Sequence, residues 1–560
     1  MEKKWWHKTV GYQIYPKSFQ DTNGDGIGDL KGVIRHLDKI EKLGANVIWL
    51  CPVFASPMVD NGYDISDYMD IDPSFGTMED MKELIAEAKK RGIRILMDLV
   101  VNHSSDRHAW FQAALQDPFG KYGKYYVFRE GKDGKEPNNW RSIFGGSAWE
   151  KVPGYDNLYY LHIFTKEQPD LNWENPELRE EIYEMILKWM DLGLGGFRLD
   201  AISHLKKNYQ YTNLPPDGPD EYNMAFEYFN NVDGLADILR EMKERTFAPT
   251  DALTIGEYDH MGPEDVEDVI GENGSFSSVF DFCHTLDNVR NPKWGNTVAL
   301  FDDYRDQLFA AQKIVDGRGM LCNFLENHDK TRIIDRFLMP EDQNRYSEKM
   351  LPVTNFFLPG IVFLYQGQEI GMTNCHRNDI SEYDDISTKD QYQVAIDAGC
   401  TKEEALACCY ENSRDNARTP MQWSADENGG FSTHAPWLAV NPNYKEINVS
   451  EQEGRADSVL SYYKELITLR KSPEYEETFV YGNVEPVYED TDTVFGFMRM
   501  GKENRQKILV AANYGKEAVS LPLPGTAKKL LLSNARRRKL ADADHITLES
   551  LETAVVLLKA

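Results

Sequence analysis

The sequence predicts an α/β fold in which eight parallel strands close a (β/α)8 TIM barrel. Short apolar runs rich in β-branched residues alternate with amphipathic helical patterns through most of the 560 residues. About eight such β-then-α units favour a closed barrel over an open doubly wound sheet, where fewer strands are usual. From about residue 475 the pattern changes to short strands without long helices, which predicts a C-terminal antiparallel β-sandwich domain.

The strands and helices are read from these patterns. Helices are expected at 33–43, 78–90 and 176–191, the last with Asn175 as its N-cap and Pro176 at its first position. The C-terminal strands are expected in TVFGFMRM, KILVAANY and AVVLLKA. We expect the eight barrel strands at 10–16, 46–52, 94–100, 195–200, 253–257, 278–282, 320–326 and 361–367.

Two long segments interrupt the alternation. Residues 104–172, after the third strand, are rich in Trp, Tyr, Gly and Lys and too long for an ordinary βα loop, so we expect a small subdomain there. A second excursion covers about 373–460 and is dense in Asn, Asp, Gly and Pro. The predicted domains are therefore a catalytic barrel at 1–103 and 173–474, an inserted subdomain B at 104–172, and a β domain at 475–560.

Composition narrows the possible partners. Lys and Arg total 62 against 91 Asp and Glu, and the net charge of -29 disfavours nucleic acid and anionic lipid. The seven cysteines form no CxxC pair, so neither a zinc site nor a disulfide framework is indicated. The N-terminus lacks the apolar run of a signal peptide, and no stretch reads as a membrane span. We expect a cytoplasmic protein that is a monomer or a weak homo-oligomer.

The loop DTNGDGIGDLKG at 21–32 places oxygen-bearing side chains at alternate positions. Gly26 stands sixth, where an EF-hand calcium loop needs a sharp turn, and Ile27 can offer its carbonyl. The twelfth position holds Gly32 instead of the bidentate Glu of an EF-hand. The residues alone leave two interpretations open, a metal-binding loop and a solvated Asp/Asn/Gly turn.

Polar residues collect at the C-terminal ends of the predicted strands, which is where barrel active sites lie. Three carboxylates at the ends of three strands suit glycoside hydrolysis, in which one attacks the anomeric carbon and a protonated one serves the leaving oxygen. Arg198 lies two residues before Asp200 on the same face, where a fixed cation is expected to hold Asp200 ionised. His103 and His328 are candidate donors to sugar hydroxyls, although the residues alone favour imidazoles that are hydrogen-bonded in the packing of the barrel. The residues at these strand ends are Asp98, Asn102, His103, Arg198, Asp200, Glu257, His328 and Asp329.

The segments DLVVNH, GFRLDAISH, TIGE and FLENHD resemble the four signature regions of the α-amylase family, glycoside hydrolase family 13, in the family's order. QPDLN at 168–172 resembles the fifth region of the oligo-1,6-glucosidase subfamily. Further matches are IYPKSFQDTNGDGIGDLKG, WLCPVFASPMVDNGYDISDY and SRDNARTPMQW, so the resemblance covers nearly the whole chain.

The resemblance implies a retaining, exo-acting α-glucosidase with a double-displacement mechanism. Asp200 matches the nucleophile that forms a β-glucosyl-enzyme, and Glu257 matches the acid that later activates water as a base. Asp329 matches the residue that binds sugar hydroxyls and stabilises the transition state. Tyr63 is expected to stack on the sugar, and Asp60 with Arg414 to hold its far hydroxyl, while Arg418 is expected to be structural. The implied terminal-glucose pocket comprises Asp60, Tyr63, His103, Phe164, Gln168, Arg198, His328 and Arg414.

The resemblance also implies one structural Ca²⁺, or Mg²⁺, in the loop after the first strand, with no organic cofactor. In the resembling subfamily no pair of helices opens around the ion, so water can complete the shell where the EF-hand Glu is missing. The expected role is a structural clip and not a sensor. The implied ligands are Asp21, Asn23, Asp25, the Ile27 carbonyl and Asp29.

The linkage preference is left open by the sequence. In the subfamily the residue after the nucleophile tends to be Val in α-1,6-acting members and Ala or Thr in α-1,4-acting members, and here it is Ala201. Whole-chain similarity favours α-1,6 bonds and Ala201 favours α-1,4 bonds, so isomaltose-type, maltose-type and sucrose substrates all stay in view. Tyr258, Asp259, Lys330 and Thr331 also depart from the expected oligo-1,6-glucosidase residues.

Three other activities occur among similar proteins. A sucrose isomerase or transglucosylase would share the catalytic residues, but the Arg- and Asp-rich loop expected of isomerases is not clear in DKTRIIDRF. A trehalose-6-phosphate hydrolase would need a cationic phosphate site, and no basic cluster is obvious. A non-catalytic transporter subunit is disfavoured because the three carboxylates are intact.

Overall fold

The eight predicted strands form the barrel. The computed structural model describes residues 2–218, 220–282, 301–535, 540 and 544–559. Neighbouring strands run parallel, and every strand lies within its predicted range, so the predicted (β/α)8 barrel is confirmed. The barrel closes in the order β1 (Val10–Ile14), β13 (Ile361–Tyr365), β12 (Leu321–Phe324), β11 (Ser278–Phe280), β10 (Leu253–Gly256), β9 (Gly196–Asp200), β5 (Arg94–Val100) and β2 (Val47–Leu50).

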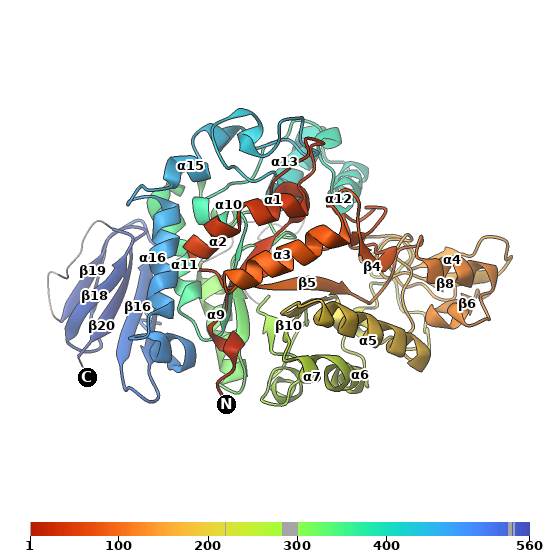
Figure 1. The fold of residues 1–560 in the computed structure, drawn as a ribbon, viewed down its shortest axis with the longest axis horizontal. Coiled ribbons are helices and arrows are strands. Elements are labelled where there is room, and N and C mark those ends of the chain that lie inside the picture. Colours follow the sequence, from red (N-terminus) through yellow and green to blue (C-terminus); the bar gives the residue numbers. More distant parts are fainter. Residues whose placement is uncertain (1, 219, 283–300, 536–539, 541–543, 560) are drawn as a thin grey trace. The chain divides into compact units, whose positions relative to one another are not determined.

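Two of the three predicted helices begin and end as expected. α3 (Met78–Lys90) lies along β5 (Figure 1), and α5 (Pro176–Asp191) follows the predicted cap, since the Asn175 side chain accepts bonds from the next turn. The helix predicted at 33–43 is instead two, α1 (Leu30–Arg35) and α2 (Leu37–Leu43), because the chain breaks at His36. The His36 ring stacks on Trp423 with centroids 3.6 Å apart, a tertiary contact that helical periodicity does not encode.

The remaining helices are mostly short. Before the seventh barrel strand the chain forms α6 (Leu235–Met242), α7 (Ala248–Thr250), α8 (Val266–Val269) and α9 (Phe301–Val315), and after it α10 (Ile333–Phe337) and α11 (Arg345–Phe356). The excursion at 373–460 holds more helix than its composition suggested. Its helices are α12 (Ile386–Asp397), α13 (Lys402–Asn412), α14 (Asp415–Arg418) and α15 (Val449–Gln452), and α16 (Val459–Lys471) follows.

The described chain divides into two compact units. The first comprises Met1–Ile48, Arg91–Ile93 and Phe280–Ala560, and the second Trp49–Lys90 and Arg94–Val279. The predicted domain boundaries near 104, 173 and 475 follow a different criterion, the change of sequence pattern, and stay predictions.

The inserted segment of the second unit has its own small core. It contains α4 (Ala109–Gln116) and a three-stranded antiparallel sheet of β6 (Phe128–Glu130), β8 (Leu158–Leu161) and β7 (Trp149–Lys151). A short hairpin, β3 (Phe54–Ala55) with β4 (Asp67–Ile71), precedes it. Trp140, Trp149 and Leu161 pack with Ala225 and Phe229 from the segment after β9. The insertion and that later segment therefore share one buried cluster.

The C-terminal part of the first unit is antiparallel, as predicted. A five-stranded sheet and a two-stranded sheet bury Leu509 and Val556 against Leu521 and Ile546. In Figure 1 these strands, coloured blue, lie beside α16, and α11 also packs on β16. The larger sheet orders β14 (Asn483–Val487), β15 (Val494–Met500), β16 (Lys507–Asn513), β20 (Thr553–Leu558) and β18 (Ala527–Ser533), and the smaller pairs β17 (Val519–Pro522) with β19 (His545–Leu548).

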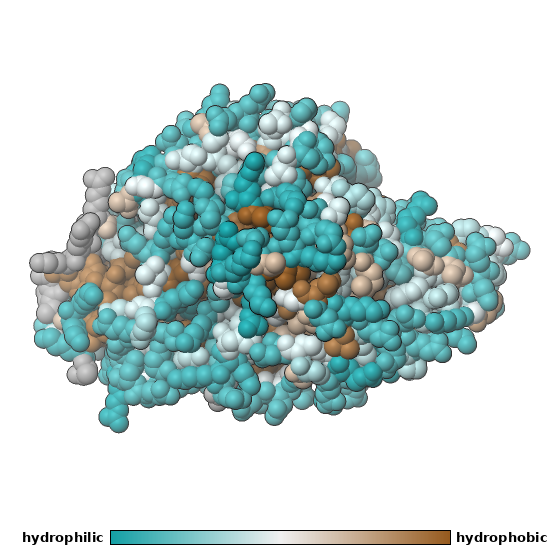
Figure 2. All heavy atoms as spheres, viewed as in Figure 1, coloured by the Kyte–Doolittle hydropathy of each residue, from teal (hydrophilic) through white to brown (hydrophobic). Residues whose placement is uncertain are grey.

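The surface agrees with the polar composition. Hydrophilic side chains cover most of the face drawn in Figure 2. Within the described residues, no helix has the length and apolar character needed to cross a bilayer. The six cysteines in the described part of the chain are free thiols, and Cys283 lies outside it.

Candidate active site

Three carboxyl groups of the second unit surround one buried guanidinium. Arg198 and Asp200 lie on the same side of β9, as their spacing predicted, and Arg198 is 2% exposed. Its Nη1 lies 2.6 Å from Asp98 Oδ1 and also contacts Asp200, and its Nη2 lies 2.8 Å from Glu257 Oε2. Glu257 directly follows β10, and its backbone N–H donates to the Leu199 carbonyl of β9. The structure therefore brings Asp200 and Glu257 together on one cation.

The pKa values in this cluster differ from those expected for a simple Arg198–Asp200 pair. Burial raises the pKa of Asp98 to about 6 and raises the pKa of Asp200. Arg198 lowers the pKa of Asp200, in the predicted direction, but Glu257 and Asp98 oppose it. The expected effect of Arg198 on Asp200 is therefore opposed by burial and by the two neighbouring carboxyls, because one guanidinium is shared among three carboxyls. The arrangement favours retention of a proton within the cluster.

Ala201 adopts an unusual backbone conformation that fixes the second carboxyl group. Its φ of 46° and ψ of 35° lie in the left-handed region, which non-glycine residues seldom occupy. In this conformation the Ala201 N–H donates to Glu257 Oε2 at 2.9 Å. Two consecutive residues therefore hold the cluster together: the Asp200 side chain contacts Arg198, and the Ala201 backbone N–H holds Glu257. Nothing in the residue types around Ala201 predicts this conformation.

The predicted sugar-contacting residues of the second unit also lie together. Gln168 Nε2 donates to Asp60 Oδ2 at 3.2 Å and to the Tyr63 carbonyl at 3.1 Å, and it lies 3.1 Å from His103 Nε2. The His103 and Phe164 rings are 5.0 Å apart. The Tyr63 hydroxyl donates to Asp98 Oδ2 at 3.1 Å, which joins this group to the carboxyl cluster.

His103 is neutral at ordinary pH. Its ring is buried, and burial lowers the pKa of His103 to about 3. A neutral imidazole beside Gln168 and Tyr63 can donate or accept a hydrogen bond without adding charge to the carboxyl cluster.

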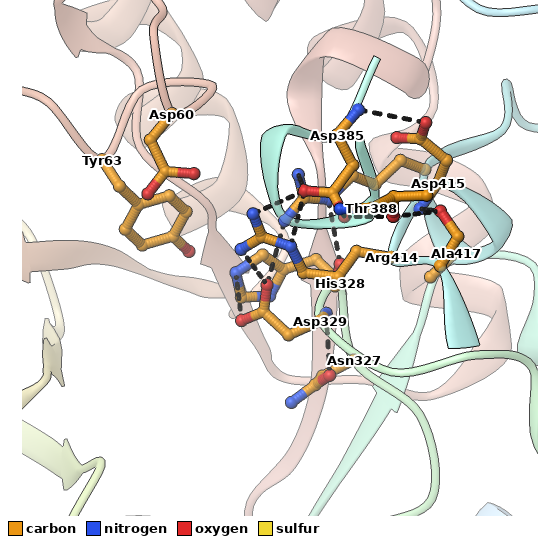
Figure 3. Close-up of polar contacts among 12 residues, drawn as sticks. Asp60, Tyr63, Asn327, His328, Asp329, Asp385, Thr388, Arg414, Asp415 and Ala417 are labelled. Carbon is orange, nitrogen blue, oxygen red and sulfur yellow. Dashed lines mark hydrogen bonds and ion pairs between the residues drawn. The ribbon is translucent and has the colours of Figure 1, made fainter. Parts of the chain in front are cut away.

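The first unit holds the remaining predicted residues around Asp329 (Figure 3). His328 Nε2 lies 3.0 Å from Asp329 Oδ2. Two guanidiniums donate to Asp329 Oδ1, Arg414 through Nη1 at 3.3 Å and Arg418 through Nη2 at 2.9 Å. Arg418 was expected to be structural, but this buried side chain contacts Asp329 directly. Asp329 and Arg414 belong to a different unit from Asp200 and Asp60, and the predicted joint roles across these pairs stay predictions.

Two residues near these groups were missed or left without a role. Asp98 was recognised at the end of its strand within DLVVNH but was given no function, although it accepts from Arg198, Tyr63 and Trp49. Asp385, which holds Arg414, belongs to no recognised motif, and its sequence context YDDIS gives no signal that would have found it.

The loop at 21–32 is closed by its own hydrogen bonds. Asp21 accepts from the N–H groups of Asn23, Gly24 and Gly26, and Asp25 accepts from Ile27. Burial acts to raise the pKa of Asp21, but these bonds and the Ser432 hydroxyl lower it. No three His, Cys, Asp or Glu side chains within the described residues are gathered to hold a metal ion. The donors are nevertheless all oxygens, and an ionised carboxylate has about four acceptor positions, so the residue types fit a calcium ion.

A family model described as alpha amylase, catalytic domain, matches residues 13–482. The chain therefore belongs to the α-amylase family, and the predicted resemblance is confirmed. It is 41% identical to the oligo-1,6-glucosidase of Parageobacillus thermoglucosidasius, with 100% of both chains covered. It is also 41% identical to the glucan 1,6-alpha-glucosidase of Streptococcus pneumoniae serotype 4, with 97% of both covered.

The chain is also similar to solved structures of proteins that are named for other activities. The trehalose-6-phosphate hydrolase of Bacillus licheniformis is similar with a TM-score of 0.91 and 37% identity, with 100% of both chains covered. The trehalulose synthase of Pseudomonas mesoacidophila MX-45 has a TM-score of 0.93 and 37% identity, also with 100% of both covered.

Proposed function

We propose that the protein is a retaining, exo-acting α-glucosidase that releases terminal α-linked glucose from short oligosaccharides. The observation that carries this proposal is the cluster in which Asp200, Glu257 and Asp98 share the Arg198 guanidinium. A double displacement requires one ionised and one protonated carboxyl group, and carboxyls that share one cation and one another's protons can hold both forms. The full-length similarity to enzymes named oligo-1,6-glucosidase and glucan 1,6-alpha-glucosidase supports the substrate class.

The reaction proceeds in two displacements. The Asp200 carboxylate attacks the anomeric carbon while the glycosidic bond breaks, and Glu257 gives its proton to the departing oxygen. The resulting β-glucosyl ester is attacked by water, whose proton passes to Glu257, and the ester bond to Asp200 breaks. Two inversions return the α-anomer. Asp329 is proposed to bind the hydroxyls of the same glucose, and Asp60 with Arg414 to close the pocket at the far hydroxyl.

A substrate comparison tests the proposal. We expect kcat/KM to be highest on isomaltose or maltose, with α-glucose as the first product detected by NMR. Oligosaccharides blocked at the non-reducing end should be resistant, because a closed pocket admits only chain ends. Preference for trehalose-6-phosphate, isomerised sucrose as the main product, or β-glucose as the first product would each contradict the proposed reaction. The first two outcomes correspond to the activities named for the similar solved structures.

Linkage preference is expected to respond to Ala201→Val. The added methyls narrow the wall beside the nucleophile, and we expect the isomaltose-to-maltose ratio of kcat/KM to rise about tenfold. The left-handed backbone disfavours a β-branched side chain, so the free energy of unfolding should fall by about 1–3 kcal/mol. Ala201→Gly is the matched control, since glycine accepts this backbone and should leave the melting temperature close to wild type. An unchanged ratio in a folded Ala201→Val variant would exclude this position as a linkage determinant.

We also propose that Asp21, Asn23, Asp25, Asp29 and the Ile27 carbonyl bind one structural Ca²⁺. The support is the all-oxygen donor set and the lowered pKa of Asp21. Adding Ca²⁺ at about 100 times its Kd to chelator-treated protein should raise the melting temperature by about 2–5 °C, because the ion binds only the folded loop.

Calorimetry on two variants checks this calcium prediction. Asp25→Asn should abolish the response, while the same change at exposed Asp70 should preserve it. A melting temperature indifferent to Ca²⁺ in the parent protein would remove the proposed ion and leave the glucosidase proposal intact, since none of the proposed catalytic residues lies in the loop.

A cytoplasmic location is proposed as well, supported by the free thiols of the six described cysteines.

A further inference from the structure

Asp385 is a buried carboxylate whose position is fixed from one side by helix α12. It stands immediately before the helix and is 1% exposed. Its Oδ2 accepts from the Thr388 backbone N–H at 3.1 Å and from the Thr388 hydroxyl at 2.6 Å. These two bonds form an N-cap, which holds the carboxylate in one orientation and stabilises the start of the helix.

The other oxygen of Asp385 fixes the guanidinium of Arg414. Asp385 Oδ1 accepts from Arg414 Nε at 2.9 Å and from Nη2 at 2.6 Å, so one whole edge of the guanidinium faces Asp385 (Figure 3). The planar group then has its Nη1 directed at Asp329, 3.3 Å away. Because a guanidinium is rigid, the orientation of one edge determines where the other donor lies.

The chain on either side of Arg414 is tied to the same helix start. Thr388 Oγ1 and Ser413 Oγ lie 2.8 Å apart, within hydrogen-bond distance, and the Asp385 backbone N–H donates to Asp415 Oδ2 at 3.1 Å. Ser413 and Asp415 are the direct neighbours of Arg414 in the sequence. Both the backbone and the side chain of Arg414 are therefore held by the segment that begins α12.

The electrostatic interactions of Asp385 also favour its pairing with Arg414. Burial acts to raise the pKa of Asp385, but Arg414 and Arg418 outweigh it and lower that pKa. Asp385 and Asp329 together balance the two guanidiniums. Without the Asp385 charge, Arg414 would lose the partner that sets the plane of its guanidinium.

We infer that Asp385 is a positioning residue for the glucosidase reaction, which orients Arg414 toward Asp329 and the terminal glucose. The inference rests on the proposed function, in which Arg414 and Asp329 bind that sugar. It adds Asp385 to the part of the excursion that contributes to substrate binding, for which the sequence had indicated only Arg414.

Asp385→Asn tests the inference because asparagine retains one acceptor oxygen for the N-cap, while it loses the charge and the second acceptor oxygen that face Arg414. We expect kcat/KM of the folded variant for p-nitrophenyl α-glucoside to fall about tenfold or more, chiefly through KM. The same substitution should have no further effect in an Arg414→Ala background, because Asp385 acts through Arg414. Asp385→Glu should recover part of the lost KM. Asp379→Asn is the matched control, since Asp379 caps an exposed 3-10 helix and should leave kinetics unchanged.

The outcomes separate this inference from the proposed function. If Asp385→Asn lowers kcat/KM equally with and without Arg414, Asp385 does not act through Arg414 and the inference is overturned. If Arg414→Ala impairs hydrolysis and folded Asp385→Asn does not, the inference is again overturned while the function stands. If neither Arg414→Ala nor Asp200→Asn impairs hydrolysis, the proposed function fails.

A milder variant serves if Asp385→Asn does not fold. Thr388→Val removes the 2.6 Å hydrogen bond from the Thr388 hydroxyl to Asp385 and leaves the charges of Asp385 and Arg414 in place. It should raise KM about two- to fivefold in the parent protein and have no effect in the Arg414→Ala background. An unchanged KM in the parent protein would count against positioning by this cap.

Discussion

Asp200→Asn is expected to lower kcat for p-nitrophenyl α-glucoside by a factor on the order of a thousand or more. The amide has nearly the same shape and still contacts Arg198, but it cannot form the glucosyl ester. The loss should appear in kcat and kcat/KM alike, because a nucleophile acts only in the reaction and not in substrate binding. Initial rates and active-site titration with a slow glucosyl donor provide the measurement.

The control for this variant is Asp191→Asn, the same chemical change at an exposed residue that ends α5. It should leave kcat and the melting temperature unchanged. Near-wild-type hydrolysis by a folded Asp200→Asn enzyme would show that another group attacks the sugar, and the double displacement assigned to this cluster would have to be abandoned.

Arg198→Met is expected to remove activity and to destabilise the fold by about 3–5 kcal/mol near pH 8. The substitution leaves Asp98, Asp200 and Glu257 without the cation that all three contact in the second unit. The two aspartates already have raised pKa values, and loss of the guanidinium raises them further.

The stability deficit should depend on pH in a defined direction. A carboxyl group whose folded pKa lies above its unfolded pKa keeps its stability at low pH and loses it as pH rises through the folded value. The gap in melting temperature between Arg198→Met and the parent should therefore be small near pH 5 and largest near pH 8. Arg107→Met, at an exposed arginine, should show no such trend. A pH-independent gap would mean that lost packing, and not the buried carboxyls, causes the destabilisation.

The sequence predicted the barrel well because its strands are apolar and lie between clear helical patterns. The strand at 94–100 and the helices at 78–90 and 176–191 have the predicted bounds, and Asn175 forms the predicted cap. The helix at 33–43 was wrong because its break depends on His36 packing against Trp423, more than 380 residues away in the chain. Local periodicity cannot report such a contact.

The candidate site was predictable to the extent that its residues stand in recognised motifs. Arg198 and Asp200 were predicted on one face from their spacing, and they lie there. The charge of the cluster was not predictable, because it depends on how many carboxyls share one cation. The left-handed backbone at Ala201 had no signal, since alanine rarely adopts it. Asp385 stands in no motif, and its contact with Arg414 arises from packing of the excursion.

The buried cluster shared by the inserted segment and the chain after β9 bears on how this part of the protein opens. Trp140 and Trp149 pack against Phe229, and Arg141 pairs with Asp220, so residues far apart in the chain depend on each other. Segments that share a core exchange their amide hydrogens as one cooperative unit. Amides in 127–163 and 223–229 should therefore show a common opening free energy, and a protease cut within 210–222 should loosen the insertion that carries Phe164 and Gln168.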